Sequence, residues 1–233
     1  MIKFISLGPG AAEMVTLGTL RFLREAQKVY CFAVGESSRA AEIIAQLDID
    51  QNKVITVKIP MSSDRSKANA VYDNLALTLK KEHEIGINIA VATEGDSGIF
   101  ATTHYVMDRL VEMGIECGQT PGVPSFVAAA SIAGLHLVKL QERLLVIPGK
   151  ISAEEILRLT SEGYNLVIMK LSLAHKAVSE AFQKAHNLIF HYFENIGTVS
   201  QKYEILKKVP ESFPYFSLMI INSPQAPKGE LFR

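Results

Sequence analysis

The sequence predicts a two-domain α/β protein with a mainly parallel first sheet and a mixed second sheet. Short runs rich in valine and isoleucine alternate with amphipathic stretches along the 233 residues. In the first half an expected helix separates each expected strand from the next, which is typical of βαβ units in a parallel sheet. In the second half the expected strands are short, which favours a mixed sheet with some antiparallel pairs.

The first half opens with a strand that ends at a glycine-rich loop. Thr16 is suited to cap the helix that follows, because a threonine hydroxyl can accept a hydrogen bond from the first helical turn. Leu17, Leu20 and Leu23 then fall on one face of that helix. We expect strands at residues 2–7, 28–33, 53–58 and 87–92, and helices at residues 16–26, 37–47 and 66–81.

The second half follows a stretch rich in turn residues, Gly118-Gln119-Thr120-Pro121-Gly122. We place the domain boundary there, which gives domains of residues 1–118 and 119–233. The tail, residues 223–233, contains two prolines and a glycine and is expected to be frayed. We expect helices at residues 125–133, 153–160, 173–184 and 199–208, and strands at residues 143–147, 166–170, 188–193 and 216–222.

Composition and charge exclude several classes of protein. With 48% hydrophobic and 21% charged residues, the chain is neither disordered, collagen-like nor a coiled coil. Its 24 basic and 24 acidic side chains balance, which argues against a nucleic-acid partner. Cys31 and Cys117 lack metal-ligand spacing, so we expect buried thiols in a reducing compartment and no metal. No apolar stretch reaches the roughly 18–20 residues of a membrane span, so we expect a cytoplasmic protein.

Three glycine-bearing loops each follow an expected strand and precede an expected helix. They are residues 7–10, 94–98 and 121–125. Ligands of open α/β sheets bind outside the carboxyl ends of the strands, which is where such loops lie. Glycine lets the backbone approach a ligand closely and offer its N–H and C=O groups directly. Three loops of this kind in one chain indicate a ligand site.

The loops do not match the phosphate-binding motifs. The first loop lacks the third glycine of G-x-G-x-x-G, and Pro9 removes a backbone donor that a pyrophosphate would need. No Gly-Lys-Ser/Thr follows it, so it is no P-loop either. A serine-hydrolase elbow and an H-E-x-x-H zinc motif are also absent from the sequence. The expected ligand therefore carries few phosphates or none, and no catalytic side chain is identified.

Segments spread along the chain occur in an order that is known from one family. Residues 5–17 read ISLGPGAAEMVTL and resemble G-x-G-P-G-D-P-E-L-L-T-L, and residues 94–100 read EGDSGIF and resemble G-D-P-x-x-[FY]-G. Residues 121–125, 167–170 and 192–198 (PGVPS, VIMK and YFENIGT) resemble P-G-[IV]-[ST]-[SA], M-K/M-G and E-x-x-G-T. In this order the segments resemble the tetrapyrrole (corrin/porphyrin) methyltransferases, which use S-adenosylmethionine.

The sequence departs from the family pattern inside each loop. Ala11-Ala12 replaces Asp-Pro, Ser97 replaces the proline of the second loop, and Pro124 stands where Ser or Thr is usual. Within the family, the chain most resembles the branch that methylates C20 of precorrin-2 or cobalt-factor II in cobalamin biosynthesis. The segments behind this resemblance are Glu94-Gly95-Asp96, residues 105–110 (YVMDRL), residues 144–149 (LLVIPG) and Met169-Lys170.

The resemblance implies an α/β fold with S-adenosylmethionine in a cleft between the two domains. The first domain would lie on the side of the substrate trough, and the second would complete the cofactor site. It also implies a homodimer and a tetrapyrrole substrate whose carboxylates meet basic side chains. The cofactor-binding residues carried over by motif are Pro9, Glu94, Gly95, Asp96, Ile99, Pro124, Ser125, Met169 and Gly197, and the candidate substrate-binding residues are Arg65, Lys67, Arg109 and Lys170.

Two other functions stay open from the sequence. One is a methyltransferase of the same family that acts on another ring carbon, on diphthamide or on ribosomal RNA. The other is a module that senses a small ligand without catalysis. The sequence also leaves open whether the tetrapyrrole already contains cobalt, since neither form needs a metal ligand on the protein.

Overall fold

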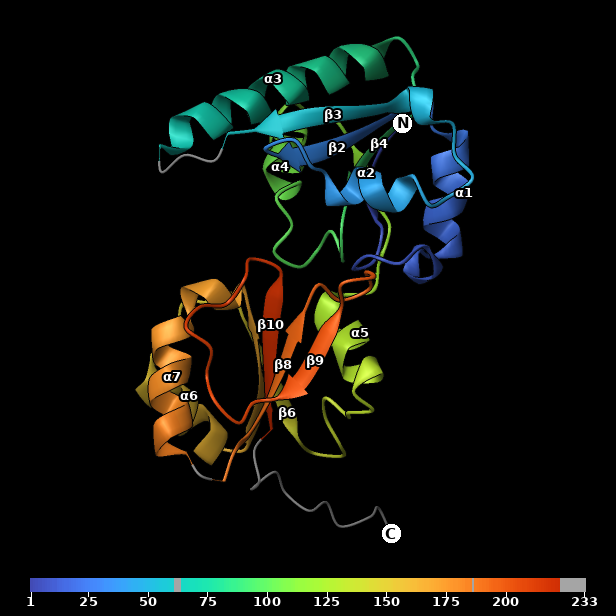
Figure 1. The fold of residues 1–233 in the computed structure, drawn as a ribbon. Helices are drawn as coiled ribbons and strands as arrows, with labels where there is room; N and C mark the ends of the chain where they lie inside the picture. The colour runs from blue at the N-terminus through green and yellow to red at the C-terminus, as the bar shows by residue number, and fades with distance from the viewer. Residues whose placement is uncertain (61–63, 186, 223–233) are drawn as a thin grey trace. The chain divides into compact units, whose positions relative to one another are not determined.

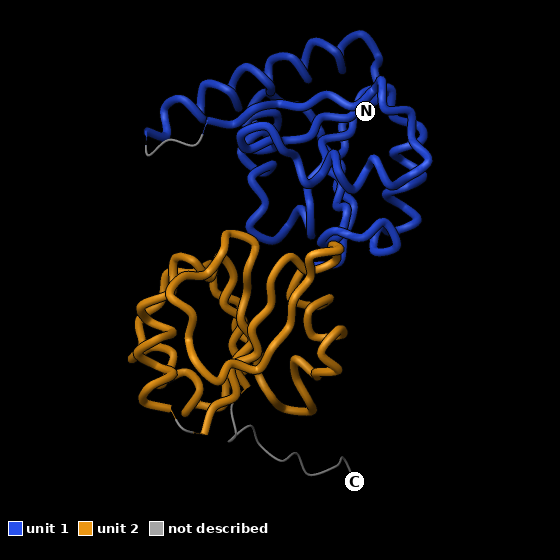
Figure 2. The backbone as a smooth tube through the Cα atoms, viewed as in Figure 1, with its two compact units in different colours: residues 1–124 blue, residues 125–233 orange. Residues whose placement is uncertain are grey.

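The computed structural model describes residues 1–60, 64–185 and 187–222, and the chain divides into two compact units, Met1–Pro124 and Ser125–Arg233 (Figure 2). The expected domain boundary, between residues 118 and 119, falls inside strand β5 (Cys117–Gln119). This strand pairs with the first strand of the chain, which places it in the first unit. The tail expected to be frayed, residues 223–233, lies outside the described residues.

The first unit contains a five-stranded sheet in the order β3-β2-β4-β1-β5, of which Figure 1 labels β3, β2 and β4. Each neighbouring pair is parallel, which confirms the mainly parallel sheet predicted for this half. No range was predicted for strand β5, because Cys117-Gly118-Gln119 carries no apolar run. The other strands are β1 (Ile2–Ser6), β2 (Lys28–Val34), β3 (Val54–Ile59) and β4 (Ile89–Thr93).

Helices cover both faces of this sheet because the crossovers run in both directions. The β1–β2 and β2–β3 connections run toward one edge, and the β3–β4 and β4–β5 connections run toward the other. Right-handed crossovers then place the two sets of helices on opposite faces. Ile89 and Val91 accordingly pack with α3 and α4, and Ala90 and Ala92 pack with α1 and α2. The helices are α1 (Leu17–Glu25), α2 (Arg39–Ile44), α3 (Arg65–Glu84) and α4 (His104–Glu112); a helix was expected after the second loop, but no range was predicted for α4.

Local signals account for the start of α1. The side chain of Thr16 accepts a hydrogen bond from the N–H of Thr19 at 3.2 Å, which confirms the predicted cap.

Cys31 is buried as expected, whereas Cys117 is only half-buried on the edge strand β5, and both are free thiols. Within the described ranges, no helix combines the length and the apolarity that crossing a membrane requires.

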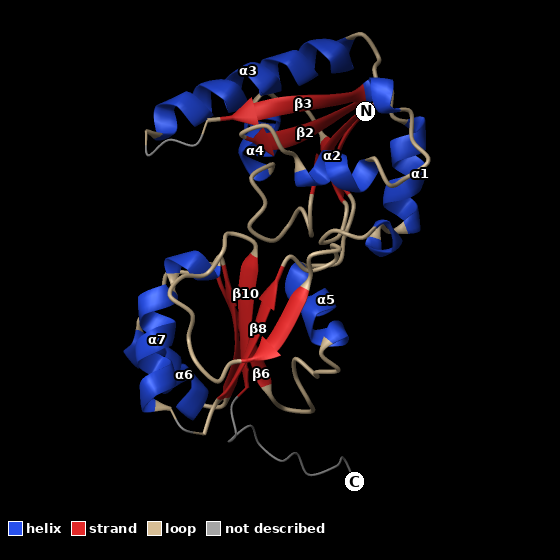
Figure 3. Ribbon diagram, viewed as in Figure 1, coloured by secondary structure: helices blue, strands red, loops and turns tan. Residues whose placement is uncertain are grey.

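The second unit contains a mixed five-stranded sheet in the order β6-β7-β10-β8-β9. Strands β6 and β7 are parallel and the other neighbours are antiparallel, which confirms the predicted mixture. Figure 3 shows α6 and α7 on one face of this sheet and α5 on the other. The elements are α5 (Ser125–Ile132), β6 (Arg143–Ile147), α6 (Ala153–Ser161), β7 (Tyr164–Met169), α7 (His175–Lys184), β8 (Ile189–Glu194), β9 (Lys202–Ile205) and β10 (Ser217–Asn222). Short 3₁₀ helices occur in both units: η1 (Ala12–Met14) and η2 (Gln51–Lys53) in the first, and η3 (Leu171–Leu173) in the second.

The prediction of a helix at residues 199–208 is wrong, because this segment contains the edge strand β9. Its polar sequence has no strong strand pattern, but the turn after β8 brings it alongside that strand in antiparallel register. Tyr203 stacks on Phe193 with ring centroids 4.8 Å apart, and its hydroxyl hydrogen-bonds Nδ1 of the buried His191 at 3.0 Å. Cross-strand packing thus decides the structure of a segment whose own propensity favours a helix.

Candidate functional site

The first two glycine loops of the first unit are joined at the carboxyl edge of its sheet. The N–H of Leu7 donates to the carbonyl of Thr93 at 3.0 Å, which extends the β1–β4 pairing. Gly8 and Gly95 then exchange two backbone hydrogen bonds, of 3.1 and 2.6 Å. Both glycines have positive φ, +72° and +68°, a backbone conformation that other residues adopt at a cost. The two loops therefore form one rigid unit rather than two independent turns.

The third loop packs directly onto the first two. A Cβ added to Gly122 would lie 2.4 Å from Cβ of Ser6 and 2.5 Å from the carbonyl oxygen of Gly95. Only glycine permits such a close approach. The glycine at this position is therefore required by packing, and it brings the three predicted loops together.

Asp96 ties the second loop to the third. Its Oδ1 accepts the N–H of Gly98 at 2.8 Å, and its Oδ2 accepts the N–H of Gly122 at 2.7 Å. Carboxylates that accept backbone N–H groups make hydrogen bonds stronger than neutral ones. Both carboxylate oxygens thus serve the loop structure, and the role that this geometry supports for Asp96 is to position the loops.

Hydroxyl groups complete the connection between the loops. The buried hydroxyl of Ser6 donates to the carbonyl of Thr120 at 2.6 Å and accepts the N–H of Ser97 at 2.8 Å. Thr120 also reaches α1, where its hydroxyl lies 2.7 Å from that of Thr19. Ser97 stands where the family pattern has proline, and a proline could not donate this hydrogen bond. This departure from the pattern therefore adds a contact between the loops.

Ser6, Thr19 and Thr120 are not among the site residues predicted from the sequence. Ser6 carries the clearest signal, because it is a hydroxyl residue that ends an apolar strand immediately before a glycine loop. Thr120 lies in the stretch that was interpreted as a domain boundary. Their contacts join residues that are far apart in the sequence.

Glu94, the first residue of the second loop, lies in a different environment from Asp96. Nε of Arg39, at the start of α2, is 3.8 Å from its Oε2. Burial raises the pKa of Glu94 to about 7. The positive charge of Arg39 acts to lower this pKa, and the negative charge of Glu42 acts to raise it. Glu94 is therefore an acidic group that changes its charge near neutral pH.

The remaining predicted residues lie in these loops or directly beside them. Pro9 is buried beside the Gly8 bridge, and the N–H of Ile99 donates to the carbonyl of Asp96 at 3.1 Å in a turn. Pro124 is half-buried and ends the first unit. Ser125, also half-buried, begins α5 of the second unit.

In the second unit the predicted segments lie at one edge of the mixed sheet. Leu218 pairs with Met169 on one side and with Phe193 on the other, so β7 and β8 end together, followed by Lys170 and Gly197 respectively. A Cβ added to Gly149 (φ +107°), after β6, would lie 2.8 Å from the carbonyl oxygen of Lys170. The fold thus brings together segments that lie far apart in the sequence.

The turns at this edge have unusual backbone conformations. Lys170 has a φ of +51° and Asn195 a φ of +48°, values that are uncommon for residues other than glycine. The N–H of Gly197 donates to the side chain of Gln201 at 2.9 Å, and the N–H of Asn195 donates to the carbonyl of Phe216 at 2.9 Å. Met169 is half-buried just before this edge. Strained turns beside a sheet edge are typical of ligand-binding loops.

Three of the predicted substrate-binding residues lie on α3 and α4. Arg65 donates to the hydroxyl of Tyr105 at 2.8 Å, and Lys67 is exposed on the same first turn of α3. Arg109 is instead engaged within the unit, by Asp73 and by the carbonyl of Tyr105 at 2.7 Å. Arg65 and Lys67 are therefore better placed to meet an anionic ligand than Arg109.

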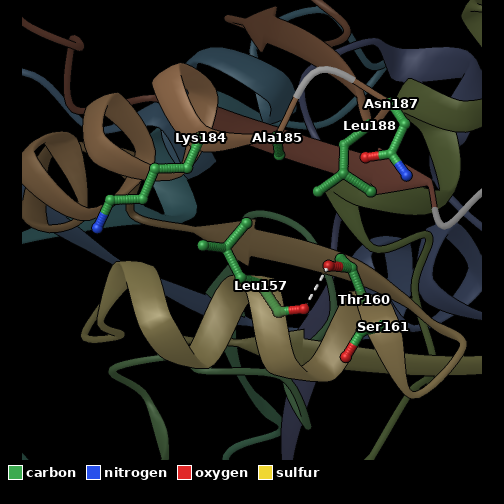
Figure 4. Close-up of a pocket in the computed structure, with 7 residues that line it drawn as sticks. All are labelled: Leu157, Thr160, Ser161, Lys184, Ala185, Asn187 and Leu188. Carbon is green, nitrogen blue, oxygen red and sulfur yellow. Dashed lines mark hydrogen bonds between the residues drawn. The ribbon is translucent and has the colours of Figure 1, made fainter.

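A separate cavity of about 140 Å³ lies between the C-terminal ends of α6 and α7 (Figure 4). It lies near the amino ends of β7 and β8, at the sheet edge opposite to Met169. The hydroxyl of Thr160 in its wall already donates to the carbonyl of Leu157 at 3.0 Å. We do not assign this cavity to the site.

Among the described residues, no group of three or more His, Cys, Asp or Glu side chains is arranged to hold a metal ion.

Comparison with known proteins gives a consistent result. The model of the family "Tetrapyrrole (Corrin/Porphyrin) Methylases" matches residues 1–208. The cobalt-precorrin-2 C(20)-methyltransferase of Salmonella typhimurium is 28% identical over 94% of this chain and 94% of its own. The crystal structure of a cobalt precorrin-4 methyltransferase has a TM-score of 0.72 at 15% identity, covering 95% of this chain and 94% of its own. The uroporphyrin-III C-methyltransferase of Thermus thermophilus, complexed with S-adenyl homocysteine, has a TM-score of 0.65 at 17% identity, with coverages of 95% and 96%.

Proposed function

Because the chain belongs to the tetrapyrrole methylase family, we propose that it transfers the methyl group of S-adenosylmethionine to C20 of precorrin-2 or cobalt-factor II in cobalamin biosynthesis. The observation that carries the proposal is the family match over residues 1–208, together with the full-length similarity to a C(20)-methyltransferase. The C20 position also agrees with the branch that the sequence motifs resemble.

The geometry of the loops supports a phosphate-free cofactor. Loops 7–10, 94–98 and 121–125 are fixed to one another, and Pro9 deprives them of a donor that a pyrophosphate would need. S-adenosylmethionine carries no phosphate, and its product is the ligand in the Thermus thermophilus relative. We propose that its binding residues are Pro9, Glu94, Gly95, Asp96, Ile99 and Pro124 of the first unit, and Ser125, Met169 and Gly197 of the second.

The proposed reaction requires little chemistry from the protein. The cofactor supplies a methyl group that its sulfonium makes electrophilic, and the conjugated macrocycle makes its bridging carbon nucleophilic. The protein has to align the carbon, the methyl group and the sulfur, and such positioning can contribute roughly 7–11 kcal/mol. The rigidity of the three loops is suited to this task. Arg65, Lys67 and Lys170 are proposed to meet the substrate carboxylates.

Transfer of a labelled methyl group tests the proposal. We expect incubation of the protein with precorrin-2 or cobalt-factor II and ¹³C-methyl-labelled S-adenosylmethionine to place the label on C20, as read by carbon NMR of the product. Separate reactions with the two substrates determine whether cobalt is already present. Label at another ring carbon, such as C11 or C17, would contradict the position but not the family. Binding without transfer to any tetrapyrrole would instead support a sensing role.

We further propose a homodimer that works in the cytoplasm. Closed two-fold assemblies are the commonest oligomers, and the family resemblance implies one here. Sedimentation at micromolar concentration is expected to give twice the chain mass of 25.6 kDa. A species at the monomer mass would contradict this prediction. The cytoplasmic location stays a prediction from the sequence.

A further inference from the structure

A carboxylate on the second loop is incompletely balanced by the protein. Glu94 follows β4 directly, and 37% of its side chain is exposed. Nε of Arg39 lies 3.8 Å away, which is too long for a hydrogen bond, and Thr93 donates to the backbone carbonyl of Glu94 rather than to its carboxylate. In the part of the chain that the structure describes, no N–H or O–H group donates a hydrogen bond to these two oxygens.

The surroundings of Glu94 disfavour its ionised form. Burial raises its pKa to about 7, the attraction of Arg39 opposes this shift, and the negative charge of Glu42 on α2 adds to it. Among the described residues, the charged groups that act on this carboxylate are Arg39 and Glu42, both on α2. A positive charge brought to the carboxylate would favour the ionised form and lower its pKa.

The backbone beside Glu94 is open. A Cβ on Gly95 would meet no atom within 4 Å, whereas the same group on Gly122 would overlap with two neighbours. Gly95 is nevertheless held in place by its two hydrogen bonds to Gly8. The incompletely balanced carboxylate of Glu94, with 37% of its side chain exposed, therefore stands directly before a glycine whose Cβ position is open.

We propose that Glu94 is the counter-ion of the cofactor's positive charge, that is, of the sulfonium or the ammonium group of S-adenosylmethionine. The inference rests on the proposed function, since it takes this cofactor as the ligand of the loops. Ionised Glu94 pairs with the cation, and the proton that neutral Glu94 carries passes to solvent through its exposed part. Cofactor binding near neutral pH therefore releases a proton.

Calorimetry of cofactor binding to the full chain, in buffers of different ionisation enthalpy, measures this proton. We expect release of about half a proton per site at pH 7, because Glu94 is then about half ionised. The matched variant Glu94→Gln keeps the shape of the side chain without its charge. The ratio of the variant's Kd to that of the wild type is expected to rise about tenfold from pH 6 to pH 8. The amino group of the cofactor titrates with both proteins and cancels in this ratio.

Two further arms complete the experiment. Glu84→Gln removes an equal charge at the exposed end of α3, at the other edge of the sheet, and is expected to bind like the wild type. S-adenosylhomocysteine keeps the ammonium but lacks the sulfonium, so release of the proton with both ligands assigns the pairing to the ammonium, and release with S-adenosylmethionine alone assigns it to the sulfonium. The same pH dependence in wild type and Glu94→Gln would overturn the inference while leaving the proposed function intact. A wild-type protein that binds no S-adenosylmethionine would overturn both.

Discussion

Replacing Gly122 by alanine is expected to abolish cofactor binding and to destabilise the first unit. The new methyl group would lie 2.4 Å from Cβ of Ser6 and 2.5 Å from the carbonyl oxygen of Gly95. Neither neighbour can yield easily, because one ends a buried strand and the other is backbone. The third loop must then move away and lose its hydrogen bond to Asp96. We expect a loss of about 3 kcal/mol or more in the free energy of unfolding, measured by denaturant titration beside calorimetry of S-adenosylmethionine binding.

Gly18→Ala is the matched control. Gly18 is exposed in the first turn of α1, where an added Cβ would find its nearest neighbour, the hydroxyl of Thr16, at 4.0 Å. Alanine favours a helix more than glycine, so this variant is expected to gain about 0.5 kcal/mol and to bind the cofactor normally. If the two alanine variants had similar stability and affinity, the close packing of the three loops would not matter for binding.

Asp96→Ala is expected to weaken cofactor binding by more than tenfold, which corresponds to about 1.4 kcal/mol or more. Removing the carboxylate leaves the N–H groups of Gly98 and Gly122 without their acceptor and frees the second loop from the third. A hydrogen bond to a charged group contributes about 1.5–3 kcal/mol, so the free energy of unfolding should fall by about 2–3 kcal/mol. Equilibrium unfolding and the KM for S-adenosylmethionine measure the two effects.

Two variants bracket this prediction. Glu84→Ala removes an acidic side chain outside the loops and should change neither stability nor KM appreciably. Asp96→Asn keeps one acceptor oxygen, so it is expected to lie between the wild type and Asp96→Ala. Small effects of equal size for Asp96→Ala and Glu84→Ala would contradict the role of Asp96 in holding the loops.

Regular elements with strong local patterns were predicted well. The parallel order of the first half follows from its alternation of strands and helices, and Thr16 caps α1 as expected. Two errors fall where the local pattern is weak. Residues 199–208 contain the edge strand β9 instead of a helix, and β5 lies where only turn residues were recognised. Edge strands of this kind gain their conformation from the neighbouring strand, which lies far away in the sequence or beyond a turn.

The candidate site shows the same division. The sequence identified the three glycine loops and their segments, because glycine, proline and acidic residues at strand ends are visible as a local pattern. It could not distinguish the two acidic residues of the second loop. The structure separates them. Each carboxylate oxygen of Asp96 accepts a backbone N–H group, whereas the carboxylate of Glu94 forms an ion pair of 3.8 Å with Arg39 and is repelled by Glu42.

The succession of residues along this chain was sufficient to predict its fold class, its glycine loops and its resemblance to a methyltransferase family. Each of these depends on local spacing, which folding does not alter. Only the tertiary structure decided that Ser6 and Thr120 connect the loops, that Gly122 has no room for a methyl group, and that Glu94 titrates near neutral pH. Those properties arise from contacts between residues about 27 to 116 positions apart in the sequence and from the solvent that their packing excludes.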